Sequence, residues 1–220
     1  MMITRRAFNT ALSLTGLAAV AGLSPWRFID GAMAQSQLAA DVAKPPSLPD
    51  MGLGPKDAAV TIVEYASMTC PHCAAFTEQV FPKIKEAYID TNKVRFVFRE
   101  FPLDIKAAAG SMLARCIAKD DPQKYFAAIH TLFKQQETWV MGKTSEQLAL
   151  IGKQAGLSEA DVDKCLKDQA LLDKIAADQK FANETLKVNS TPTFFINGEM
   201  IKGETSFEEF DKRIKAILKT

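Results

Sequence analysis

The clearest pattern in the chain is a pair of strand signals separated by a helical period. Residues 60–66 form a β-branched, mostly apolar run that is typical of a strand covered on both faces. From residue 71 to about residue 89 the apolar side chains recur at helical spacing, on one side of the predicted helix: Phe76, Val80, Phe81, Ile84 and Tyr88. Residues 94–100 alternate and predict a second strand. Two parallel strands joined by a crossover helix would satisfy this order.

The second half of the chain changes period twice. Between residue 104 and about residue 183 the pattern is helical throughout, with one helix start predicted at Ser158. Pro192 then precedes an apolar strand that ends in the Asn197-Gly198 turn. A capping box that begins at Ser206 predicts the start of a last helix with an apolar stripe. The predicted order is therefore β-α-β, a helical insert, and β-β-α.

The N-terminal region has the features of an export signal. Arg5-Arg6 precedes an apolar stretch over residues 11–23, and Ala32-Met33-Ala34 provides a cleavage site, so residues 1–34 are predicted to be a cleavable signal peptide. The paired arginines resemble a twin-arginine motif, although Asn9-Thr10 departs from it, so both the Tat and the Sec routes stay open. Export from a bacterium would place the mature protein in the periplasm.

The next segment and the overall charge limit the possible functions. Residues 35–57 contain Pro46, Pro49, Gly52 and Gly54, which predict an extended N-terminal arm without a core of its own. Residues 1–34 carry three of the 27 basic and one of the 26 acidic side chains, so the remainder has a net charge of −1. This near-neutral charge gives no reason to expect a nucleic-acid partner.

Cys70-Pro71-His72-Cys73 lies at the junction of the first strand and its helix. Pro71 suits the first helical position, so Cys70 would lie at the helix N-terminus, where free N–H groups and the helix dipole favour a thiolate. A C-x-x-C pair in this context is typical of a redox dithiol. A zinc site would need four ligands, and the remaining candidates, Cys116, Cys165 and His130, are scattered along the chain. We therefore expect no metal.

Thr191-Pro192 completes a recognisable combination. A C-x-x-C pair at a βα junction and a downstream proline before a strand match the thioredoxin pattern, in which a cis-proline loop faces the dithiol. With Cys-Pro-His-Cys as its motif, the chain from about Ala58 onward resembles the DsbA family of thiol–disulfide oxidoreductases. The resemblance implies an α/β thioredoxin fold with an inserted helical domain. Its parts would be a first half at 58–103, a helical insert at 104–184 and a second half at 185–220.

The resemblance also implies roles for individual residues. Cys70 and Cys73 would be the catalytic pair, with Pro71 and His72 between them and His72 adding charge or a hydrogen bond to the Cys70 sulfur. Alternatively, His72 is only an exposed helix residue. Ser190, Thr191 and Pro192 would bind the client chain. No cofactor is implied.

Glu64 and Thr191 are the two residues whose roles stay open. Glu64 interrupts an apolar strand where DsbA-like proteins carry a buried acid, and it could pass a proton to Cys73. It could equally be a strand-edge residue paired with Arg95 or Arg99. Thr191 occupies the position before the proline, where DsbA-type oxidases often have Val, whereas Thr is common in isomerases and reductases and in some alphaproteobacterial and Gram-positive oxidases.

Cys116 and Cys165 lie on separate helical runs of the insert. In an oxidising compartment an even number of cysteines favours a structural disulfide between them, and some DsbA relatives carry one. The alternative is two buried, unpaired thiols. A further feature, Trp139-Val140-Met141, predicts either an exposed apolar loop that contacts clients or a core contact.

These observations favour one function and leave two alternatives. The leading hypothesis is a periplasmic dithiol oxidase that forms a mixed disulfide between Cys70 and a reduced exported client. A membrane quinone-linked enzyme of the DsbB type would reoxidise the dithiol, and the protein would be a monomer. The alternatives are a disulfide reductase or isomerase, and a peptide-binding chaperone with an incidental dithiol.

Overall fold

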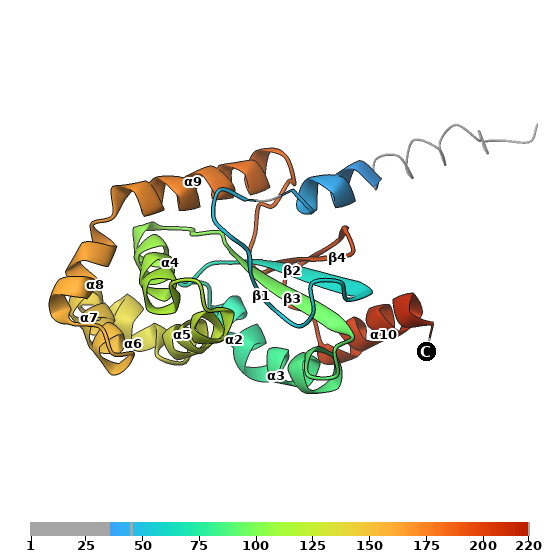
Figure 1. The fold of residues 1–220 in the computed structure, drawn as a ribbon, viewed down its shortest axis with the longest axis horizontal. Coiled ribbons are helices and arrows are strands. Elements are labelled where there is room, and N and C mark those ends of the chain that lie inside the picture. Colours follow the sequence, from blue (N-terminus) through green and yellow to red (C-terminus); the bar gives the residue numbers. More distant parts are fainter. Residues whose placement is uncertain (1–35, 45, 220) are drawn as a thin grey trace, which may run out of the picture.

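A five-stranded mixed sheet forms the centre of the protein in a computed structural model that describes residues 36–44 and 46–219 (Figure 1). The predicted signal peptide lies outside the described residues. The strand order is β1-β3-β2-β4-β5. The strands are β1 (Met51–Leu53), β2 (Val60–Ala66), β3 (Val94–Glu100), β4 (Thr193–Ile196) and β5 (Glu199–Lys202).

Strand β2 lies in the middle of the sheet and is buried on both faces, as its β-branched sequence predicts. It pairs in parallel with β3, with Ile62 opposite Phe96, and antiparallel with β4. Ile62 packs in the cluster that contains Phe96 and the side chains of α3 and α10, whereas Val63 packs in a separate cluster on the other face. Because side chains alternate along a strand, Glu64 lies on the same face as Ile62.

The crossover from β2 to β3 is helical but interrupted. It comprises α2 (Pro71–Gln79), α3 (Phe81–Ile84) and a π-helical turn, η1 (Lys85–Ile89). The single helix that the apolar period predicts is therefore broken at Val80. Pro82 explains the break, because a proline ring clashes with the carbonyl four residues earlier and has no N–H to donate.

Helices α4 to α9 connect β3 to β4 and form the lobe at the left of Figure 1. This confirms the helical insert in the predicted order of elements. Helix α8 begins at a capping box between Ser158 and Asp161. The helices are α4 (Ile105–Ala118), α5 (Pro122–Lys134), α6 (Gln136–Met141), α7 (Thr144–Gln154), α8 (Glu159–Leu166) and α9 (Gln169–Glu184), and the chain closes with α10 (Phe207–Leu218).

The N-terminal segment is more ordered than an extended arm. Residues 36–42 form a helix, and β1 pairs antiparallel with β3. Arg99 holds this segment by donating to both carboxylate oxygens of Asp50, at 2.8 and 2.9 Å, and to the Val42 carbonyl. A three-residue edge strand is too short to show an apolar period, so the glycines and prolines around it predicted only an extended arm. Within the described ranges, no helix has the length and apolar character of a membrane span.

A buried ion pair joins the sheet to the helical lobe. Arg115 on α4 binds both carboxylate oxygens of Glu100 at the end of β3, at 2.5 and 2.8 Å, and also donates to the Pro49 carbonyl. The Tyr125 hydroxyl of α5 donates to the same carboxylate. Because Arg115 and Glu100 are both almost fully buried, loss of one partner would leave an uncompensated charge in the core.

We predict that Arg115→Met lowers the free energy of unfolding by about 3–5 kcal/mol, the usual cost of breaking a buried pair from one side. Urea denaturation measures this change. Arg213→Met is the matched control, because Arg213 pairs with Glu199 and Glu209 at the surface and such pairs contribute at most about 1 kcal/mol. Equal effects of the two substitutions would contradict the structural role given to the buried pair.

Candidate active site

The dithiol lies at the N-terminus of α2, directly after the loop that follows β2. Cys70 is the N-cap residue and Pro71 the first helical residue, so the free N–H groups of the first turn surround the Cys70 sulfur. Both cysteines are free thiols in this structure. Cys70 is 5% exposed and Cys73, one turn further along, is fully buried. Cys70 is thus the sulfur nearer to solvent.

The two thiols differ strongly in acidity. The pKa of Cys70 is lowered to about 5 because the ionised sulfur can accept hydrogen bonds from the Cys73 side chain, from the Thr191 side chain and from the backbone N–H groups of Cys73 and His72, which together outweigh the effect of burial. Burial raises the pKa of the Cys73 thiol far above its usual range, and the neighbouring Cys70 and Glu64 raise it further. A single thiolate on Cys70 is therefore the stable form of the reduced pair.

The loop before β4 faces the dithiol. The Thr191–Pro192 peptide bond is cis, and the Thr191 carbonyl accepts a hydrogen bond from the Cys70 thiol at 3.3 Å. The buried Thr191 hydroxyl makes no hydrogen bond to any of the described residues, so it is available to the Cys70 sulfur when that sulfur ionises. Ser190 lies at the exposed start of the loop. The structure thus brings the cis-proline loop to the C-x-x-C motif through Thr191.

The His72 side chain bonds to a residue that the sequence did not indicate. Its Nδ1 lies 3.2 Å from Glu204 Oε2, and both side chains are exposed. The contribution of His72 to the low pKa of Cys70 comes from its backbone N–H. Glu204 follows Gly203 in the loop before α10, and no local pattern distinguishes it from an ordinary surface carboxylate.

Glu64 lies in β2 with its side chain buried beneath the dithiol. It is 1% exposed, and its Oε1 atom has no hydrogen-bond partner in the described part of the chain. Burial, reinforced by the charge on Cys70, raises its pKa well above the usual range. Arg99 instead binds Asp50, and Arg95 donates to the Gly54 carbonyl. These arginines alternate onto the opposite face of the sheet, so neither pairs with Glu64.

Two hydrogen bonds from the helical lobe hold the Cys70 loop in place. The Gln136 side chain of α6 donates to the carbonyls of Met68 and Cys70, at 2.9 and 3.0 Å. The Thr69 hydroxyl donates to Asp104 at 2.7 Å, and Asp104 also caps α4. No local sequence pattern marks these residues, because each pair is far apart in the chain.

The segment Trp139-Val140-Met141 belongs to α6 and divides between core and surface. Trp139 is fully buried and donates to the Leu132 carbonyl, whereas Met141 is 80% exposed. Lys106 on α4 donates to the Val140 carbonyl at 2.6 Å and so joins the end of α6 to the start of α4, where Ile105 is 72% exposed. Exposed apolar side chains therefore lie on the helices whose residues hold the Cys70 loop.

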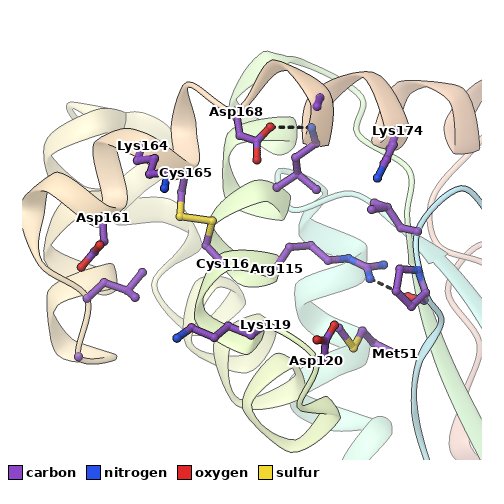
Figure 2. A pocket seen from close by; sticks show the side chains of 16 residues that line it. Met51, Arg115, Cys116, Lys119, Asp120, Asp161, Lys164, Cys165, Asp168 and Lys174 are labelled. Atoms are coloured by element: carbon purple, nitrogen blue, oxygen red, sulfur yellow. Dashed lines mark hydrogen bonds between the residues drawn. A yellow bond between two sulfur atoms is a disulfide. The ribbon is translucent and has the colours of Figure 1, made fainter.

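The second cysteine pair forms a disulfide between α4 and α8. Cys116 and Cys165 are bonded, with 49 residues of sequence separation. Figure 2 shows this bond on the wall of a cavity of about 610 Å³, with Arg115, Lys119 and Lys164 nearby. The disulfide fastens α8, which otherwise buries little of its surface, to the long helix α4.

The fold and the dithiol opposite a cis-proline define a thioredoxin-fold protein with a paired-cysteine site, and three comparisons agree with this class. A family model described as thioredoxin matches residues 47–216. A putative protein-disulfide oxidoreductase of Rickettsia bellii is 40% identical over 150 residues, covering 68% of this chain and 57% of the relative. A probable disulfide bond formation protein D of Bacillus cereus is 31% identical over 177 residues, covering 75% of this chain and 76% of the relative.

Among solved structures, α-DsbA1 of Wolbachia pipientis superposes with a TM-score of 0.73 at 32% identity, covering 80% of this chain and 94% of that chain. BdbD of Bacillus subtilis superposes with a TM-score of 0.68 at 25% identity, covering 78% and 94% respectively. The chain belongs to the DsbA family of thioredoxin-fold proteins. It spans little more than half the length of the Rickettsia relatives that it matches.

We predict that alkylation of Cys70 in the reduced protein rises with a midpoint near pH 5, because the thiolate is the reactive form. Thr191→Val removes one hydrogen bond to the sulfur and should raise this midpoint by roughly one pH unit, which corresponds to about 1.4 kcal/mol. Site-resolved mass spectrometry of iodoacetamide labelling gives both midpoints. Thr191→Ser keeps the hydroxyl and should resemble the wild type; a midpoint unchanged in Thr191→Val would show that the hydroxyl has no effect.

We predict that the paired substitution Cys116→Ala and Cys165→Ala lowers the free energy of unfolding by about 4 kcal/mol, from the chain entropy of a loop of this length. Urea denaturation under oxidising conditions measures the loss. Non-reducing peptide mapping of a Cys70→Ala, Cys73→Ala protein should recover Cys116 and Cys165 in one linked peptide pair. Recovery of two free thiols would contradict the bond.

Proposed function

We propose that the protein is a thiol–disulfide oxidoreductase that transfers its Cys70–Cys73 disulfide to exported protein clients. The observation that carries the proposal is the unequal acidity of the two thiols, with the pKa of Cys70 near 5 and that of Cys73 raised. The names of the relatives, disulfide oxidoreductase and disulfide bond formation protein, support the same activity.

The low pKa of Cys70 favours the reduced enzyme and hence donation of the disulfide. At pH 7, a thiol with a pKa of about 5 is almost fully ionised, whereas an ordinary thiol is not. The difference stabilises the reduced form by about 3 kcal/mol. For a two-electron couple this raises the reduction potential by about 60 mV relative to the same dithiol with an ordinary Cys70.

The reaction that fits this geometry starts at the more accessible sulfur. A client thiolate attacks Cys70 Sγ, the Cys70–Cys73 bond breaks, and Cys73 leaves as a thiolate. The buried, protonated Glu64 can supply the proton that Cys73 then takes, because burial favours the neutral form of both groups. A second client thiolate attacks the client sulfur of the mixed disulfide and releases Cys70 as a stable thiolate. The client loses two electrons and the enzyme gains them.

Clients would bind across the loop and the apolar surface beside it. The loop of Ser190, Thr191 and Pro192 meets the dithiol at Thr191 and can pair with a client backbone as an added strand. The exposed side chains of Ile105 and Met141 offer apolar contacts that suit an unfolded chain, whose apolar residues are not yet buried.

The compartment and the electron acceptor belong to the same proposal. Export through residues 1–34 would place the enzyme in the periplasm, where a dithiol oxidase needs continual reoxidation. A membrane quinone-linked partner of the DsbB type would accept the two electrons from Cys70 and Cys73. The dithiol carries the electrons itself, so the exchange with clients requires no cofactor.

A reductase or isomerase is the second candidate, and Thr191 is the observation that favours it. Threonine before the cis-proline is common in isomerases and reductases, whereas many DsbA-type oxidases have valine there. The two candidates share the site and the mixed disulfide, and they differ in the potential at which the site operates.

We predict that Cys73→Ala accumulates client adducts linked through Cys70, because the adduct cannot be resolved by the second cysteine. Trapping in bacterial cells and diagonal gel electrophoresis would detect them, with Cys70→Ala as the control that forms none.

The reduction potential, measured by equilibration in glutathione buffers, then separates the candidates. A value near about −120 mV supports the oxidase, and one near about −200 to −230 mV supports the reductase or isomerase. Absence of a reversible transition would leave a peptide-binding role.

A further inference from the structure

A cavity of about 210 Å³ lies beside Glu64, between α2, α3, β3 and α5. Its floor includes the buried carboxyl of Glu64 and the Thr77 side chain, and Pro82 and His130 lie exposed at its edge. Between floor and edge the wall is largely aromatic and aliphatic. The apolar lining consists of Phe81, Phe96, Phe98, Phe126 and Ile129.

The irregular crossover helix forms one side of this cavity. Phe81 and Pro82 follow the break at Val80, and Lys85 begins the π-helical turn, a feature that is often found at functional sites. Thr77 lies four residues after Cys73 on α2, hence one turn away on the same helix face. The cavity therefore lies one helical turn from the dithiol while opening to solvent elsewhere.

The lining defines the chemistry of an occupant. Buried polar atoms in proteins are almost always hydrogen-bonded, yet Glu64 Oε1 has no partner among the described residues. Between the floor and the edge, the apolar wall offers an ordered water none of the two or more polar partners that it needs. Apolar cavities of about 150 Å³ accommodate a benzene ring, so this volume admits one ring with a small substituent.

The aromatic side chains favour a ring rather than an aliphatic chain. Phe81 stacks on Phe126 with ring centroids 5.7 Å apart, and it meets Phe96 edge-on at 4.9 Å. A further ring placed among them could adopt the same offset and edge-to-face contacts, which stabilise aromatic pairs beyond the area that they bury.

We propose that this cavity binds a small molecule with one aromatic ring and one hydroxyl group, whose hydroxyl donates a hydrogen bond to Glu64 Oε1. The ring itself would lie in apolar surroundings, because the polar side chains of Lys85 and His130 lie at the edge of the cavity. Lys85 is paired there with Asp90. Such a ligand would separate Glu64 from solvent. The binding site is inferred from the cavity and does not depend on the redox activity. A further consequence, slower protonation of Cys73 and so slower turnover when the ligand is bound, rests on the proposed function.

Phenol, with toluene as the analogue that lacks the hydroxyl, tests the site in the full-length mature protein. Titrations followed by amide NMR should show phenol shifting the signals of residues that line the cavity.

Glu64→Leu should weaken the affinity for phenol about tenfold, the value of one buried hydrogen bond, and should leave the affinity for toluene unchanged or higher. Ile129→Phe fills the space and should weaken both probes. Leu150→Phe, at an exposed position outside the cavity, is the matched control and should weaken neither.

The outcomes separate this site from the redox activity. Failure of phenol to shift the lining residues, or equal phenol affinity of the wild type and Glu64→Leu, overturns the site. The result with Ile129→Phe is used only if this variant shows a native unfolding transition. If the variant does not fold, the affinities of the wild type and of Glu64→Leu for the two probes test the site instead. Binding without a slower rate of client oxidation would overturn the regulatory consequence. Absence of a reversible redox transition would overturn the proposed function and leave the binding result intact.

Discussion

The site depends on one constraint: three acidic groups share a buried space that stabilises a single negative charge. Burial raises the pKa of Glu64 and of Cys73, the charge on Cys70 raises both further, and the charge on Glu64 also raises the pKa of Cys73. Only Cys70 lies at the helix N-terminus, where backbone N–H groups and the Thr191 hydroxyl can surround a thiolate. The charge therefore localises on the sulfur nearest to solvent, and its two neighbours stay protonated. This distribution makes Cys70 the better leaving group from a mixed disulfide, because the thiol of lower pKa leaves faster.

The scaffold around the site fixes the position of that charge. The Cys70 loop is held from the helical lobe by Gln136 and through the contact between Thr69 and Asp104. The cis-proline loop approaches from the other half of the thioredoxin fold. The lobe can hold the loop only if it is rigidly attached to the sheet, and the buried pair between Arg115 and Glu100 provides that attachment. The inserted helices thus contribute to the acidity of Cys70 without supplying a charged group to it.

The sequence predicted those features that are determined locally. The β-branched run of β2, the period of the crossover and the proline after Cys70 each depend on neighbouring residues, and the fold class followed from their order. The missed contacts join distant positions: 132 residues separate His72 from Glu204, and 66 separate Gln136 from Cys70. No local period marks such pairs, because their partners are chosen by packing. The break in the crossover helix lies between these two cases. Pro82, which causes it, is visible in the sequence, but the apolar stripe continues past Pro82 and so predicted one unbroken helix.

Glu64 and Cys70 link stability to pH in opposite directions, and this explains why the oxidation state matters to the fold. The folded-state pKa of Glu64 is raised, so its neutral form stabilises the protein at low pH and that contribution is lost as the pH rises above its ordinary value near 4.5. The folded-state pKa of Cys70 is lowered to about 5, so the reduced protein gains stability from the thiolate as the pH rises from about 5 toward the ordinary thiol value near 9. Formation of the disulfide removes the second contribution and lessens the first, because the charge on Cys70 is part of what raises the pKa of Glu64. At neutral pH the oxidised protein therefore lacks the stability that the Cys70 thiolate gives the reduced protein, and this difference favours the proposed transfer of the disulfide.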